Sequence, residues 1–127
     1  MSSPCPVPLR LVTKMNKLKS LQKRADRLLQ EKNRSEKPIC ENCGKPSQVA
    51  HHFYPKSISS ALRYNMDNII SLCNGCHFSH HNGNPVIHAN VVHKRGHIWY
   101  KDLLKNKEKI VKPSQTYYKQ IIYNLEN

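Results

Sequence analysis

Two C-x-x-C pairs constrain the fold of this chain more than any other feature. The first pair is Cys40 and Cys43 in "CENC", and the second is Cys73 and Cys76 in "CNGC". Two such turns, here called the zinc knuckles, can complete the closed tetrahedral geometry of a structural Zn²⁺ site. The 29 residues between them, 44–72, exceed the about 15–20 of a compact zinc ribbon. We therefore expect a four-cysteine site that supplies much of the folding free energy, with a further structural element inserted between the knuckles.

The alternatives for these four cysteines are a disulfide framework, a redox dithiol or plain core residues. A fifth cysteine, Cys5, lies in an N-terminal stretch rich in proline, where we expect irregular backbone and a free thiol. The odd count and the lack of an export signal argue against an oxidising compartment. The sequence also has no run of about 18 apolar residues and no lipidation motif. We expect no membrane association and an intracellular location.

The charge balance predicts a polyanionic partner. The 127 residues include 21 Lys and Arg against 8 Asp and Glu, which gives a net charge of +13 with histidine neutral. Hydrophobic residues make up 38% and aromatic residues 7%, so the apolar core is modest and a metal or partner should help to stabilise it. The excess of positive charge exceeds what solubility needs and favours nucleic acid.

Helices are predicted at both ends of the chain. Apolar residues recur every three or four positions over 11–32, as in an amphipathic helix. Its opposite face is basic and includes Lys23, Arg24 and Arg27, which suits either a solvated face or contact with a phosphate backbone. The apolar stripe is a core face or the contact of a homodimer. We expect a linker at "NRSEKP", a helix at "HIWYKDLLKNK", and a final helix capped by Ser114.

The segment between and after the knuckles predicts a compact β and α unit. Short strands are expected near 47–53 and 69–72, and "NGCHFSHHN" should form a short helix that ends at the following Asn, Gly and Pro. Residues 57–68 should be a short helix or loop that carries Arg63.

The histidines of this segment suggest a second metal site. His51 and His52 are adjacent in a predicted strand, so their side chains point to opposite faces and should have different roles. His77 and His81 lie four residues apart on one helix face, as two ligands of one ion require. His51 or His52 can supply the third ligand, and the other can act as a general base beside the ion. His80 points about 100° away from His81, so we expect a surface or phosphate-contacting residue.

Together with Asn68, these residues resemble the HNH (ββα-metal) endonucleases. The resemblance implies that His51 is a metal ligand, that His52 is the general base, and that Asn68 holds the hairpin loop and orients the base. It also implies that His77 and His81 complete the site of one catalytic divalent ion, which could be Mg²⁺, Mn²⁺, Zn²⁺ or Ni²⁺. Such an ion stabilises the charge of the phosphate and the leaving 3′-oxygen while the base deprotonates the attacking water.

A wider set of segments is similar to the phage lambda NinG-type recombination endonucleases. It includes "KLKSLQKRADRLLQ", "PICENCGK", "ALRYNMDNIISLCNGCH" and "GNPVIH", and covers residues 14–107. This resemblance implies that the partner is DNA, with branched DNA or a four-way junction as candidate forms, and that the protein acts in the cytoplasm of a bacterial host cell.

The sequence therefore predicts an α+β protein. We expect a basic arm and helix over 1–36, a zinc-stabilised ββα-metal core over 37–84, and a helical extension over 85–127. The predicted function is metal-dependent hydrolysis of DNA phosphodiester bonds, with Arg63, Lys56 and His80 on neighbouring phosphates. One alternative is a zinc-stabilised nucleic-acid-binding protein without catalysis, and another is an interaction protein whose histidines bind a second structural zinc. The remaining histidines, His88, His93 and His97, are expected at the surface or in packing.

Overall fold

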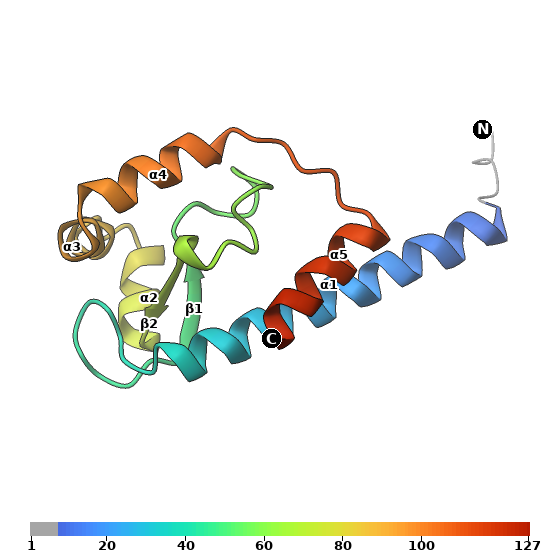
Figure 1. Cartoon of the computed structure of the whole chain (residues 1–127). Helices are drawn as coiled ribbons and strands as arrows, with labels where there is room; N and C mark the ends of the chain where they lie inside the picture. Colours follow the sequence, from blue (N-terminus) through green and yellow to red (C-terminus); the bar gives the residue numbers. More distant parts are fainter. Residues whose placement is uncertain (1–7) are drawn as a thin grey trace, which may run out of the picture. The chain divides into compact units, whose positions relative to one another are not determined.

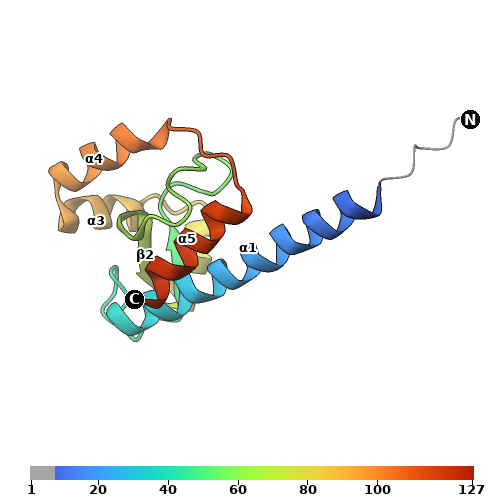
Figure 2. The same cartoon turned by 45° about the vertical axis from the view of Figure 1, so that its right-hand side comes forward.

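The computed structural model describes residues 8–127, so the predictions for Cys5 and its surroundings lie outside the described part. The chain divides into two compact units. One contains the chain up to Leu28 together with Pro113–Asn127, and the other is Leu29–Lys112. Figures 1 and 2 show the elements of each unit.

The second unit is built around a β-hairpin followed directly by a helix. Strands β1 (Val49–His52) and β2 (Ile69–Leu72) are antiparallel, with His51 opposite Ile70 and His52 opposite Ile69. Cys73 caps α2 (Asn74–His81), which packs against both strands. Figure 1 shows this ββα arrangement. It confirms the predicted α+β class and lies close to the predicted strand and helix positions.

Two further helices cover the hairpin unit. They are α3 (Val86–Arg95) and α4 (His97–Lys107), joined at Gly96, whose φ of 92° favours glycine. Helix α4 was predicted, and α3 lies within the helical extension expected over 85–127. The core under these helices comprises Phe53, Leu62, Ile70, Leu72, Ile87, Val91 and Leu103, with Trp99 and Tyr100 packed against it.

Helix α1 (Leu9–Glu36) is longer than predicted and runs through both units. The prediction of a linker at "NRSEKP" was wrong for its first four residues, which are helical. Asn33 is buried and its amide donates to Ser71 Oγ at 2.8 Å, while its backbone oxygen accepts from Lys37 N. These contacts hold the last turn of the helix, and the sequence from Leu9 to Lys37 contains no proline or glycine.

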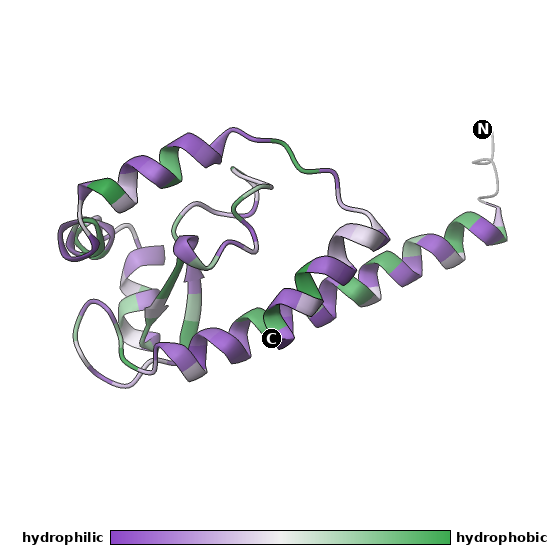
Figure 3. Ribbon diagram, viewed as in Figure 1, coloured by the Kyte–Doolittle hydropathy of each residue, from purple (hydrophilic) through white to green (hydrophobic). Residues whose placement is uncertain are grey.

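The first unit contains the early part of α1 and the final helix α5 (Gln115–Glu126). Ser114 Oγ accepts a hydrogen bond from Tyr117 N, which confirms the predicted cap. Tyr118 and Ile122 of α5 are buried, and Arg24 forms an ion pair with Glu126. Figure 3 shows that apolar and polar residues alternate along both helices.

Candidate metal centre and nuclease site

The four cysteines of the zinc knuckles lie together. The sulfur atoms of Cys40, Cys43, Cys73 and Cys76 are all within 4.8 Å of one another. The first knuckle is a tight turn in which Gly44 N donates to the Cys40 carbonyl and Gly44 has a φ of 81°. The second knuckle is the N-terminus of α2. This geometry fits a closed structural zinc site, as the spacing predicted.

The chemistry of the thiols also fits a cation. Burial would raise the pKa of Cys40, but N–H groups of Cys43, Cys73 and Asn42 lower it to about 6. The Cys76 N–H lowers the pKa of Cys73. Burial and the neighbouring sulfurs instead raise the pKa of Cys76 to about 12, although Asn42 donates to it. Four thiolates at this spacing repel one another, so a divalent cation is needed to hold them all deprotonated.

The hairpin and α2 also bring three histidines together. Ligand nitrogens of His51, His77 and His81 lie within 4.8 Å of one another. The Nε2 atoms of His77 and His81 are 2.9 Å apart, and the His51 ring centroid lies 5.3 Å from that of His77. Of the two adjacent histidines, it is therefore His51 that joins the pair on α2. Three imidazoles are a suitable donor set for a borderline divalent ion.

Burial favours the neutral form of His51 and His77. The pKa of His51 is lowered to about 3, first by burial and then by the positive charge that the neighbouring histidines would carry. The pKa of His77 is also lowered, by burial and then by His81 and His80. Neutral imidazoles offer a lone pair to a metal ion, whereas imidazolium does not.

His52 is held on the opposite side of the strand by a loop carbonyl. Its Nε2 lies 2.8 Å from the backbone oxygen of Arg63. Because a carbonyl only accepts, Nε2 carries the proton and Nδ1 is the basic atom of the ring. This is the tautomer and fixed orientation that a general base requires.

Asn68 is buried and closes the loop that joins the two strands of the hairpin. Its Oδ1 accepts from Tyr54 N at 2.9 Å, and its Nδ2 donates to the carbonyls of Tyr54 and Leu62 at 3.1 and 3.2 Å. These hydrogen bonds of its side chain all run to the loop backbone. The expected link to His52 is indirect, because the Leu62 carbonyl immediately precedes the Arg63 residue that holds the imidazole.

An open pocket of about 600 Å³ contains this arrangement. Its lining includes His51, His52, His77 and His81, and also the exposed Lys56. Arg63, expected on a phosphate, is half-buried with its guanidinium over the Tyr64 ring and is not part of this lining.

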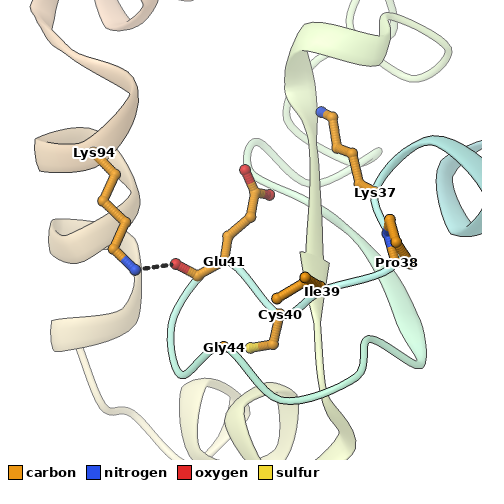
Figure 4. A pocket seen from close by; sticks show the side chains of 7 residues that line it. All are labelled: Lys37, Pro38, Ile39, Cys40, Glu41, Gly44 and Lys94. Carbon is orange, nitrogen blue, oxygen red and sulfur yellow. Dashed lines mark hydrogen bonds between the residues drawn. The ribbon is translucent and has the colours of Figure 1, made fainter.

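A different cavity, of about 490 Å³, lies beside the first knuckle (Figure 4). Its lining includes Cys40, Glu41 and Lys37 together with Lys94, whose Nζ donates to the Glu41 carbonyl at 2.7 Å. The lining contains none of the clustered histidines, so the chemistry of the site belongs to the other pocket.

His80 and His88 both join the histidines around His51. His80 is half-buried, and its ring stacks on that of His88 with centroids 4.0 Å apart. The expectation of a surface position was wrong because His80 is three residues after His77, and positions i and i+3 share a helix face. His88 Nε2 lies 3.0 Å from His51 Nε2, and its ring stacks on Phe53. Sequence reasoning assigned no site role to His88, which the turn after α2 brings back against His51.

The basic residues predicted on the first helix are exposed. Lys23, Arg24 and Arg27 line, with Ser20, a surface hollow of about 420 Å³ in the first unit. Arg24 is also the residue paired with Glu126. Their positions suit contact with a phosphate backbone.

A comparison with known families gives a match over the ββα core. Residues 40–83 match the family model described as HNH endonuclease. The matched segment holds both knuckles, both strands and α2, so the match supports assignment of the ββα core to the HNH family. Neither a search of curated proteins nor a search of solved structures found a match.

Within residues 8–127, no helix has the length and apolar character needed to cross a membrane.

Proposed function

We propose that this protein is a metal-dependent endonuclease that hydrolyses phosphodiester bonds of DNA. The observation that carries the proposal is the geometry of the HNH-matching segment. His51, His77 and His81 offer three ligand nitrogens within 4.8 Å of one another, and His52 lines the same pocket from the other face of the strand. A zinc module that served only as a scaffold needs the four cysteines but not this set.

The three histidines would hold the divalent ion, which when bound supplies Lewis-acid stabilisation of the phosphate charge. His52 Nδ1 takes a proton from a water molecule as the bond from its oxygen to phosphorus forms and the bond to the 3′-oxygen breaks. The Arg63 carbonyl retains the Nε2 proton, so the ring becomes an oriented imidazolium. Asn68 is a positioning residue that fixes the loop carrying this carbonyl.

Lys56 is the side chain best placed for a phosphate next to the scissile one, since it is exposed and lines the pocket. Lys23, Arg24 and Arg27 would contact DNA backbone from the first unit, and the net charge of +13 supports binding to a polyanion. A phosphate contact by His80 remains a prediction, although its ring packs against His51 and His88.

The resemblance to the NinG-type enzymes supports a finer proposal, that the substrate is a branched intermediate of phage recombination. The boundaries 1–36, 37–84 and 85–127 and the host-cell cytoplasm remain predictions. A homodimer also remains a prediction. Leu11 and Met15 of α1 are 48% and 47% exposed, so part of the apolar stripe is available for such a contact.

Cleavage of supercoiled plasmid and of a four-way junction tests the proposal. Purified protein is incubated with EDTA, Mg²⁺, Mn²⁺, Zn²⁺ or Ni²⁺, and His52→Ala is compared with His93→Ala, which removes an exposed histidine. We expect nicking by the wild type and His93→Ala, and a loss of about 10²–10⁴-fold in His52→Ala. The proposal fails if His52→Ala cuts as well as wild type. It also fails if the wild type binds DNA but does not cut it in the presence of any of the tested ions. That outcome would identify a non-catalytic zinc-stabilised binding protein.

A further inference from the structure

Five histidines form one continuous cluster, and His51 lies at its centre. The His51 ring centroid is 5.3, 4.8, 5.9 and 5.3 Å from those of His77, His80, His81 and His88. This cluster offers two overlapping sets of three ligands, and both contain His51. The first set is completed by the α2 pair described above, and the second by His80 and His88.

The second set has the geometry of a metal site in its own right. Its ligand nitrogens lie within 4.8 Å of one another, and the Nε2 atoms of His51 and His88 are 3.0 Å apart. Two nitrogens bound to one ion at about 2.0–2.1 Å lie about 2.9–3.4 Å apart for bond angles between octahedral and tetrahedral values. Small adjustments of side-chain torsions would therefore bring the set onto an ion.

Hydrogen bonding alone leaves this side of the cluster incomplete. His80 Nδ1 is buried with no hydrogen-bond partner among the described residues. Buried polar nitrogens normally have a partner, and an orphaned one calls for a bound ion, a water or another explanation. A coordinated ion would satisfy the basic nitrogen of a neutral ring.

We propose that His51, His80 and His88 form a second site for a divalent transition-metal ion such as Zn²⁺, and that an ion bound there withholds His51 from His77 and His81. A neutral imidazole has only one lone-pair nitrogen, so His51 serves one set at a time. The two sites are therefore mutually exclusive. Three imidazoles favour zinc, nickel or cobalt over Mg²⁺, which prefers oxygen ligands.

The second site is placed to inhibit. The lining of the open pocket includes His51, His77 and His81 but neither His80 nor His88. An ion held by the second set is thus displaced from the pocket in which a phosphate would lie. It occupies the shared ligand without contacting the substrate.

Binding of Co²⁺ tests the site without any assay of cleavage. Protein carrying zinc in its four-cysteine site is titrated with Co²⁺. Binding is measured by the visible absorption of the bound ion and by metal analysis. His77→Gln/His81→Gln removes the first set, His80→Gln/His88→Gln removes the second, and His51→Gln removes both. His93→Gln is the matched control, because it lies on the same helix as His88 but is exposed. Retained zinc content and far-UV circular dichroism verify that each variant is folded.

We expect one Co²⁺ at the histidines of the wild type, of His93→Gln and of either double variant. In His51→Gln the affinity of the histidines for Co²⁺ should fall by at least about 10-fold. Loss of the hydrogen-bond partner of a metal ligand already has an effect of this size, and loss of the ligand itself should have a larger one. The second site is refuted if His77→Gln/His81→Gln binds Co²⁺ no more tightly than His51→Gln, which would make His80 and His88 packing residues. Two ions bound at once to the wild-type histidines would refute mutual exclusion.

The inhibitory consequence rests on the proposed nuclease activity. Excess Zn²⁺ should suppress Mn²⁺-supported cleavage, and His88→Gln should raise the half-inhibiting Zn²⁺ concentration by at least about 10-fold, whereas His93→Gln should not. An unchanged Zn²⁺ response in His88→Gln overturns the inhibitory role. If Co²⁺ occupies the second set but the wild type cleaves no DNA, the site stands and the proposed function fails.

Discussion

Replacement of Asn68 by alanine should both destabilise the hairpin unit and disable the proposed base. The side chain is fully buried and makes three hydrogen bonds, one from Tyr54 N and two to the carbonyls of Tyr54 and Leu62. A net value of about 1 kcal/mol for each gives about 3 kcal/mol. Because water does not reach the site in the folded state, the loop groups left unpaired should raise the loss to about 3–4 kcal/mol.

The effect on activity should exceed the effect on the folded fraction. Asn68 holds the Leu62 carbonyl, and the next carbonyl along the chain, that of Arg63, orients His52. A displacement of about 1 Å in a catalytic group can cost about 10²-fold in rate. We expect a loss of this size for protein that is still folded.

Urea unfolding at a fixed zinc concentration and plasmid nicking under native conditions measure the two effects. Asn65→Ala is the control, since the exposed Asn65 Oδ1 cap accepts a hydrogen bond from Asp67 N at the start of the short helix Met66–Asn68. It should cost about 1 kcal/mol, as for other caps, with little loss of nicking. The reasoning is refuted if Asn68→Ala costs less than Asn65→Ala, or if it nicks DNA as fast as wild type when equally folded.

Three further predictions address the metal, the knuckle and the DNA. Chelation of zinc should unfold the Leu29–Lys112 unit, whereas His77→Ala should remain folded but inactive; circular dichroism that survives complete zinc removal would contradict the structural role. Arg95 makes a bidentate, half-buried ion pair with Glu41 of the first knuckle. Arg95→Met should therefore lower the free energy of unfolding in urea by about 2–3 kcal/mol. A loss below about 0.5 kcal/mol would show that the pair is replaceable. Lys56→Ala should reduce the slope of log DNA affinity against log salt concentration by about 1, as measured by fluorescence anisotropy. Lys101→Ala on α4 is the exposed control. An equal reduction in both variants would contradict a specific phosphate contact by Lys56.

The parts of the fold that depend on short-range spacing were predictable. The C-x-x-C turns, the helix with His77 and His81, and the cap at Ser114 each need only four or five consecutive residues. The end of α1 was mispredicted because Asn33 usually favours helix ends, but here its amide is buried against Ser71, 38 residues away. Such a contact overrides local preference and leaves no mark in the local sequence.

The histidine cluster was likewise predictable only in part. The position of His80 was accessible from the sequence, because its distance of three residues from His77 already places both on one face. The role of His88 was not accessible, since it depends on α3 folding back so that the ring meets His51 and Phe53. Sequence periodicity describes a helix face but does not say which strand that face meets.

We call His51 and His52 the histidine doublet. Their different roles require that strand β1 keeps its register with β2. A shift of one residue in register would exchange the two side chains between the metal cluster and the loop carbonyl. The doublet lies between two amide clamps. Gln30 accepts from Ala50 N and donates to Ala50 O on one side, both at 3.2 Å, and Asn68 bonds the N–H and the carbonyl of Tyr54 on the other. Each clamp satisfies backbone groups that a two-stranded sheet leaves unpaired. Register, and with it the division between ligand and base, is therefore fixed by side chains outside the metal-binding cluster.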